Sequence, residues 1–224
     1  MTWLMNNWAT ALELGAAHLL LALPAIALSV LIALPIGRFA NRHPRFGSPL
    51  LSVTTLLYAI PSLPLLIMIP SFFGTPLRSP ATMIIALTVY GVALMVRTSV
   101  DAFNSIPQTT LSAATAIGFS RSSLLWQVEL PLAIPVIISG VRVVAVSTIG
   151  LVTIGSLIGI QSLGSLLTDG FQRGIVAEVA TGAIATVALA LMVDALLNLI
   201  GRMLTPWTRA SQQTDQMKLE GDIQ

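Results

Sequence analysis

The chain has 224 residues, of which 55% are hydrophobic and only 9% are charged, and its mean hydropathy is +0.88. This composition excludes a soluble globular domain, which must keep a polar surface in water, and predicts an all-α integral membrane protein. The formal net charge of +2 argues against a nucleic-acid partner, and the absence of cysteine excludes disulfides and thiolate catalysis. His18 and His43 lie too far apart in the sequence to predict a metal site.

Five apolar segments approach the roughly 20 residues that a helix needs to cross the apolar core of a bilayer. No positively charged segment and no cleavage site accompany the first segment, so we expect it to be kept as a span. The predicted spans are 17–36, 50–73, 81–96, 132–157 and 176–200. Residues 1–210 are thus expected to form one transmembrane domain, and the polar segment 211–224 a disordered cytoplasmic tail.

The distribution of lysine and arginine predicts how the chain is oriented in the membrane. Cytoplasmic loops carry an excess of these residues, and an external N-terminus places most of them inside. Trp3 and Trp8 in the opening segment suit an external position at the membrane interface. We therefore expect an external N-terminus and a cytoplasmic C-terminus. The residues then inside are Arg38, Arg42, Arg45, Arg97, Arg121, Arg202, Arg209 and Lys218, whereas Arg78 and Arg173 lie outside.

Three prolines, Pro61, Pro64 and Pro70, interrupt the second predicted span. Each removes a backbone donor and bends or loosens its helix. One interpretation is a set of tolerated kinks, whose freed carbonyls are satisfied by neighbours. The other is a broken span that lines a transport pathway and rocks during alternating access. The candidate pathway residues in that case are Tyr58, Pro61, Ser62, Pro64 and Ser71.

Later segments leave further alternatives open. Arg142 falls within the fourth predicted span and is expected to pair with Asp194 or to bind backbone carbonyls. Gly155 and Gly159 permit close helix approach, either inside the subunit or between two subunits. The segment 161–174 is too polar to span, and is either an external re-entrant or gate segment or an ordinary connecting loop.

The longest predicted cytoplasmic loop covers about residues 98–130. Asn104 or Ser105 is expected to cap a helix with Pro107 in its first turn, and Gly118 to end that helix. Ser120 is expected to cap a second short helix. The loop is therefore predicted to form a compact helical platform. Such helices either carry a function or simply cover the ends of spans at the interface.

The spacing of small residues in this loop is specific. Ser112-Ala113-Ala114 is followed by three residues, Gly118, nine residues, and then Val128-Glu129-Leu130-Pro131. This pattern resembles the cytoplasmic EAA motif (EAA-x3-G-x9-I-x-LP) of permease subunits of binding-protein-dependent ABC importers. Ser112 and Val128 depart from it, since the family has Glu and Ile there. The resemblance implies a type I ABC importer permease fold, in which this platform is the coupling helix that docks on an ATPase. The residues to which it gives this role are Ser112, Ala113, Ala114, Gly118, Phe119, Arg121, Leu130 and Pro131.

Three further stretches, 58–74, 128–142 and 154–167, look like the osmoprotectant branch of these permeases. That likeness implies ATP-driven import of glycine betaine, choline, carnitine or similar quaternary amines across the bacterial inner membrane. The alternatives are an importer of another small solute such as an amino acid, or an ATP-independent secondary carrier. The expected partners are an ABC ATPase dimer, an extracytoplasmic binding protein, a second permease, identical or related, and the lipid bilayer.

The chain is not expected to be an enzyme. No GxxxxGK[ST] phosphate-binding loop occurs, so ATP and Mg are expected on the partner ATPase, with no cofactor in this chain. No HExxH or GxSxG pattern occurs either, which argues against an intramembrane hydrolase.

Overall fold

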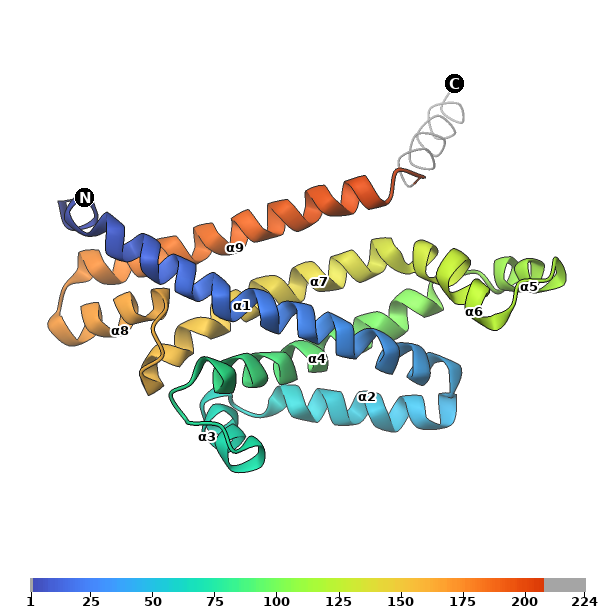
Figure 1. The fold of residues 1–224 in the computed structure, drawn as a ribbon, viewed down its shortest axis with the longest axis horizontal. Helices are drawn as coiled ribbons and strands as arrows, with labels where there is room; N and C mark the ends of the chain where they lie inside the picture. Colours follow the sequence, from blue (N-terminus) through green and yellow to red (C-terminus); the bar gives the residue numbers. More distant parts are fainter. Residues whose placement is uncertain (1, 208–224) are drawn as a thin grey trace, which may run out of the picture.

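The computed structural model describes residues 2–207, and all of the regular structure in this part is helical (Figure 1). The expected all-α architecture is therefore confirmed, while the predicted tail at 211–224 lies outside the described residues. The α-helices are α1 (Thr2–Arg42), α2 (Pro44–Ala59), α3 (Ser62–Phe73), α4 (Pro80–Asn104), α5 (Gln108–Ala116), α6 (Arg121–Leu124), α7 (Leu130–Val152), α8 (Leu163–Arg173) and α9 (Val176–Leu204). A π-helical turn, Leu125–Glu129, precedes α7, and a 3-10 helix, Thr153–Ile158, follows it.

The long helices run side by side along the longest axis of the molecule (Figure 1). The start of α1 and the helix α8 lie at one end of this bundle, and α5 and α6 project from the other. The last helix, α9, runs toward the end that carries α5 and α6. The polar platform predicted at 98–130 therefore lies at the opposite end of the bundle from the N-terminal end of α1.

In the described part of the chain, four helical stretches are long and apolar enough to cross a membrane, and there are five if the bent pair α2–α3 is counted as one span. All four are longer than the hydropathy pattern predicts. Helix α1 is kinked at Asn7, and its long part, Asn6–Arg42, has 37 residues, or about 55 Å at 1.5 Å per residue, so it extends beyond the apolar core of a bilayer. Helix α4 ends at Asn104 instead of Val96, which places Arg97 within the helix and not in a loop.

Of the two interpretations of the second predicted span, 50–73, the structure shows the break and not a kinked continuous helix. The chain breaks after Ala59, and α2 and α3 are bent by 108° relative to each other. Ile60 and Pro61 are extended, with ψ values of 128° and 140°. Proline disfavours the helical conformation of the residue before it, so Pro61 accounts for the extended Ile60. Pro70, by contrast, is accommodated inside α3.

Helices α1 and α4 form the central contact of the bundle, and small residues let their backbones approach closely. Gly91 faces Ser29, whose hydroxyl donates to the carbonyls of Ala25 (2.7 Å) and Thr88 (3.3 Å). Gly37 faces Ser99 in the same way. Apolar clusters lie on both sides of this polar layer, one around Met83 and Ile149 and the other around Met95 and Ile137.

We expect Gly91→Ala to destabilise the bundle, because a methyl group at this position would overlap the Ser29 side chain. Overpacking of this kind costs about 1–3 kcal/mol. The check is the midpoint of thermal unfolding of the detergent-solubilised protein. Gly15→Ala in α1 is the matched control, since nothing lies within 4 Å of the added methyl group there. Equal midpoints for the two variants would contradict the close α1–α4 contact.

Candidate functional site

The platform consists of α5, a turn at Gly118, α6 and the π-helical turn. A Schellman motif ends α5: the Phe119 amide donates to the Ala114 carbonyl (3.2 Å), and the Gly118 amide donates to that of Thr115 (3.1 Å). Gly118 adopts φ = +97°, a conformation that glycine reaches without the steric cost other residues incur. The predicted end of this helix is confirmed.

The capping predictions for the platform have mixed outcomes. The Ser120 hydroxyl accepts from the Ser123 amide (3.2 Å) and caps α6 as predicted. The predicted cap at Asn104 or Ser105 is wrong, because α4 continues through Asn104 and Ser105 is its C-terminal cap. Pro107 instead precedes α5 and offers no side-chain hydrogen bond. The loop thus begins later than residue 98.

The eight residues predicted to couple this chain to an ATPase do not share one surface. Ser112, Ala113, Gly118 and Arg121 are exposed at the tip of the platform. Ala114 is buried against the chain itself, and Phe119 is half-buried. Leu130 and Pro131 lie away from the tip, at the start of α7. The sequence reasoning missed Ile117, which is 78% exposed beside Gly118 and gives the tip an apolar contact residue.

A buried carboxylate joins the base of the platform to α1. Glu129 accepts one hydrogen bond from Arg38 Nε (2.9 Å) and one from Arg42 Nη2 (2.8 Å). The two arginines are four residues apart and so lie on the same face of α1. Glu129 ends the π-helical turn, a rare form of helix that often marks functional sites. These bonds connect the base of the platform to α1, while the chain itself connects it to α7.

The break between α2 and α3 forms one wall of a cavity of about 460 Å³. The Tyr90 hydroxyl donates to the Ile60 carbonyl, for which the imino nitrogen of Pro64 offers no donor. The rings of Tyr58 and Tyr90 meet edge to face with their centroids 6.0 Å apart. The lining residues are Tyr58, Ile60, Ser62, Tyr90, Ser147, Gly150 and Leu151.

The predicted pathway residues are only partly brought together by this cavity. Tyr58 and Ser62 line it, and Pro61 lies at the break beside it. Pro64 and Ser71 are exposed on α3 and do not line it. Tyr90 was not among the predicted residues, because nothing in the apolar pattern of α4 distinguishes a pathway tyrosine from a packed one.

Arg142 in the fourth span is paired with Asp194 of α9, the first of its two predicted partners. Its Nε and Nη2 donate to the two carboxylate oxygens, each over 2.7 Å. This bidentate geometry fits a planar guanidinium to a carboxylate. Both charges are neutralised where the apolar helices α7 and α9 contact each other.

The polar segment 161–174, predicted as either a re-entrant or gate segment or a connecting loop, contains a folded helix. Ser162 caps α8 in a capping box with Ser165, and Gly174 ends the helix with φ = +69°. Its glycine Gly170 packs on Glu178 and Val179 of α9. The role of α8 as a gate stays a prediction.

These features define a class of protein: a multi-pass helical membrane protein with an exposed helical platform and no phosphate-binding loop in its sequence. The chain belongs to the family described as binding-protein-dependent transport system inner membrane component, whose model matches residues 25–210. This match confirms the expected membership in the permease family of binding-protein-dependent importers.

Curated relatives align with most of the chain. The osmoprotectant import permease protein OsmW of Salmonella typhimurium is 32% identical over 91% of this chain and 96% of its own length. The glycine betaine/carnitine/choline transport system permease protein OpuCD of Bacillus subtilis is 27% identical over 92% and 89%. The choline transport system permease protein OpuBB of Bacillus subtilis is 29% identical over 91% and 93%.

Solved structures share the fold. An inward-facing structure of the MetNI methionine ABC transporter matches with a TM-score of 0.77 at 19% identity, over 87% of this chain and 96% of the other. An amino acid ABC transporter solved with histidines matches with a TM-score of 0.67 at 16% identity, over 92% and 96%. The expected type I ABC importer permease fold is confirmed.

Proposed function

We propose that this chain is the permease subunit of an ATP-driven, binding-protein-dependent importer of small osmoprotectants such as glycine betaine, choline and carnitine. The observation that carries the proposal is the platform, a complete EAA-type spacing built as two short helices around Gly118 and exposed at one end of a membrane bundle. The printed functions of the three relatives above support the substrate class.

The chain requires partners for this function. A dimer of ABC ATPases binds ATP and Mg and receives the platform on the cytoplasmic side. An extracytoplasmic binding protein delivers the solute at the end that carries α8. A second permease, identical or related, completes the pathway. The N-terminus is external in this arrangement, in agreement with the distribution of arginines and lysines.

The work of the chain is to convert closure of the ATPases into a movement of its spans. ATP binding draws the two platforms together. The connection through Leu130 and Pro131 moves α7, and the Arg38–Glu129–Arg42 ion pairs move α1 with it. The bundle then opens outward to receive the solute, and hydrolysis returns it to the inward-open state. The bend between α2 and α3 lets one span change shape during this cycle.

The test is uptake by the reconstituted complex. The chain, its ATPase and its binding protein are placed in proteoliposomes, and ATP-dependent uptake of labelled glycine betaine is measured with choline and carnitine as competitors. We expect uptake that requires ATP and all components. Uptake without ATP would show a secondary carrier instead. Failure with every quaternary amine, while the binding protein still stimulates ATP hydrolysis, would show an importer of another solute.

A further inference from the structure

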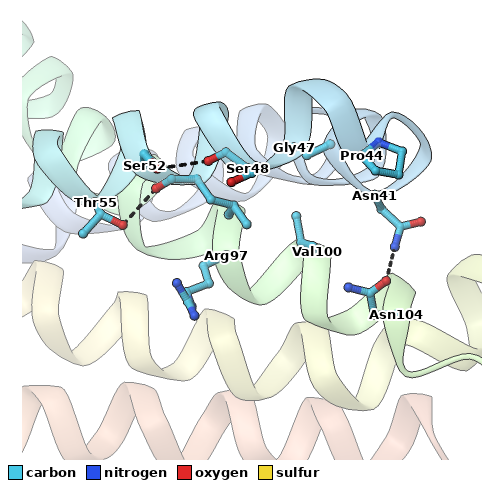
Figure 2. Close-up of a pocket in the computed structure, with 11 residues that line it drawn as sticks. Asn41, Pro44, Gly47, Ser48, Ser52, Thr55, Arg97, Val100 and Asn104 are labelled. Atoms are coloured by element: carbon cyan, nitrogen blue, oxygen red, sulfur yellow. Dashed lines mark hydrogen bonds between the residues drawn. The ribbon is translucent and has the colours of Figure 1, made fainter.

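A polar cavity of about 450 Å³ lies where α2, α4 and the end of α1 meet (Figure 2). Arg97 of α4 lies below Ser52 and Thr55 of α2 in Figure 2. The side chains of Asn41 and Asn104 meet at the far end, where Asn41 Nδ2 donates to Asn104 Oδ1 over 2.6 Å. The polar lining residues are Asn41, Ser48, Ser52, Thr55, Arg97 and Asn104.

The charge of Arg97 is not neutralised within the described part of the chain. No carboxylate among residues 6–207 lies within ion-pair distance of it, and Asp101, one turn further along α4, does not pair with it. Arg97 is exposed on α4, seven residues before the helix ends at Asn104, whereas Arg142 in α7 has its counter-charge in Asp194. An unpaired arginine in a membrane helix is costly, and it is placed against a cavity or a ligand when it is retained.

Two hydroxyl groups that line the same cavity as Arg97 can donate hydrogen bonds to an anion. Ser52 Oγ donates to the Ser48 carbonyl (3.1 Å), and Thr55 Oγ1 donates to that of Leu51 (2.8 Å). These bonds stay within α2, so a rotation about χ1 frees each hydroxyl to donate elsewhere. A planar guanidinium with nearby hydroxyl donors suits a carboxylate, which accepts two parallel hydrogen bonds.

The same two helices, together with α7, line the cavity of about 460 Å³ that contains Tyr58 and Tyr90. Tyr58 continues the face of α2 that carries Thr55, Ser52 and Ser48, and Tyr90 precedes Arg97 by seven residues on one stripe of α4. Aromatic faces attract quaternary ammonium groups. The wall made by α2 and α4 thus carries two tyrosines and, about 10 Å further on, an arginine. This separation exceeds that of the charges in glycine betaine, whose nitrogen and carboxylate are joined by one methylene group, so the solute meets the two groups in succession.

We propose that Arg97, with Ser52 and Thr55, binds the carboxylate of a zwitterionic osmoprotectant on its way to the cytoplasm, an inference that rests on the proposed function. The permease then selects among quaternary amines in addition to the binding protein. Glycine betaine and carnitine carry a carboxylate, and choline does not. Choline meets only the repulsion of the guanidinium, so the zwitterions pass more readily. The site lies open, as transport requires, because a tightly held solute would not be released.

The experiment compares two solutes in the reconstituted complex, in vesicles of purely zwitterionic lipid. Arg97→Gln is expected to lower the initial rate of glycine betaine uptake about tenfold, the value of one charge-assisted hydrogen bond. Choline uptake should stay the same or rise. Arg97→Lys should recover part of the betaine rate. The matched control is Arg202→Gln, which removes an exposed charge near the end of α9 and should change neither rate.

Stimulation of ATP hydrolysis by the binding protein shows that each variant is folded and assembled. Equal losses of betaine and choline uptake in Arg97→Gln would overturn the carboxylate site but leave the importer intact. A wild type that imports choline alone would also overturn the carboxylate site. An effect of Arg97→Gln seen only in vesicles with anionic lipid would overturn it as well, because it would assign the arginine to a lipid headgroup. A wild type that imports no quaternary amine would instead overturn the proposed function.

Discussion

Replacing Gly118 with Asp is expected to reduce ATP-driven uptake about tenfold or more, while the chain still inserts into the membrane. Gly118 has φ = +97°, and nothing lies within 4 Å of a side chain added there. The variant therefore suffers no internal overlap. It loses the left-handed turn that ends α5, at a cost of roughly 1–3 kcal/mol, and it places a carboxylate at the exposed tip beside Ile117. Both changes alter the surface that we assign to the ATPase.

The measurement pairs solute uptake with ATP hydrolysis in proteoliposomes that contain equal amounts of inserted permease. Gly74→Asp is the matched control, because Gly74 also has a positive φ (+65°) and open space but ends α3 in another part of the molecule. We expect the control to retain most of its uptake. Normal transport by Gly118→Asp, or an equal loss in both variants, would reject the assigned role of the platform.

Glu129→Ala is expected to have the largest effect on stability. Removing one partner of a buried ion pair costs about 3–5 kcal/mol. The cost here is reduced to roughly 2–3 kcal/mol, since the side chains of Arg38 and Arg42 remain 22% and 37% exposed and water screens them. The variant leaves two arginines side by side with no counter-charge. We expect a lower midpoint of thermal unfolding. We also expect more ATP to be hydrolysed for each solute molecule imported.

Two milder variants distinguish the ion pairs from simple packing. Arg42→Ala should cost less than Glu129→Ala, because Glu129 keeps its bond to Arg38. Glu129→Gln preserves the size of the side chain and removes its charge, so it should fall between them. Thermal midpoints that decrease in the order wild type, Arg42→Ala, Glu129→Gln, Glu129→Ala would support a stabilising role of the Arg38–Glu129–Arg42 ion pairs. A Glu129→Ala variant with the thermal midpoint and the coupled transport of the wild type would show that these ion pairs contribute to neither stability nor coupling.

The platform was predictable because its determinants are local. A glycine that ends a helix, a serine that caps the next one and the interval to Leu130-Pro131 are all properties of one continuous stretch. The Schellman geometry at Gly118 follows from the same residues. The burial of Ala114 was not predictable in this way, since it depends on how α5 folds back toward α6 and the π-helical turn.

Long-range contacts set the limit of the sequence reasoning. Glu129 occupies a variable position of the EAA motif, and Arg38 and Arg42 precede it by 91 and 87 residues, so no spacing connects them. The Arg142–Asp194 pair was foreseen because a charge inside an apolar span demands a partner, and few were available. The prolines predicted a bend in the second span but not its size, because the 108° angle depends on where α3 packs on α4.

The most direct test of the account is a cross-link from the tip of the platform. The chain has no cysteine, so a single introduced cysteine carries a photoactivatable reagent to one known position. Ile117→Cys and Phe171→Cys are the two sites, 78% and 82% exposed at opposite ends of the bundle. We predict that Ile117→Cys links to the ATPase in the assembled complex and that Phe171→Cys does not. An ATPase captured from Phe171, or none from Ile117, would contradict the docking of this platform on the ATPase.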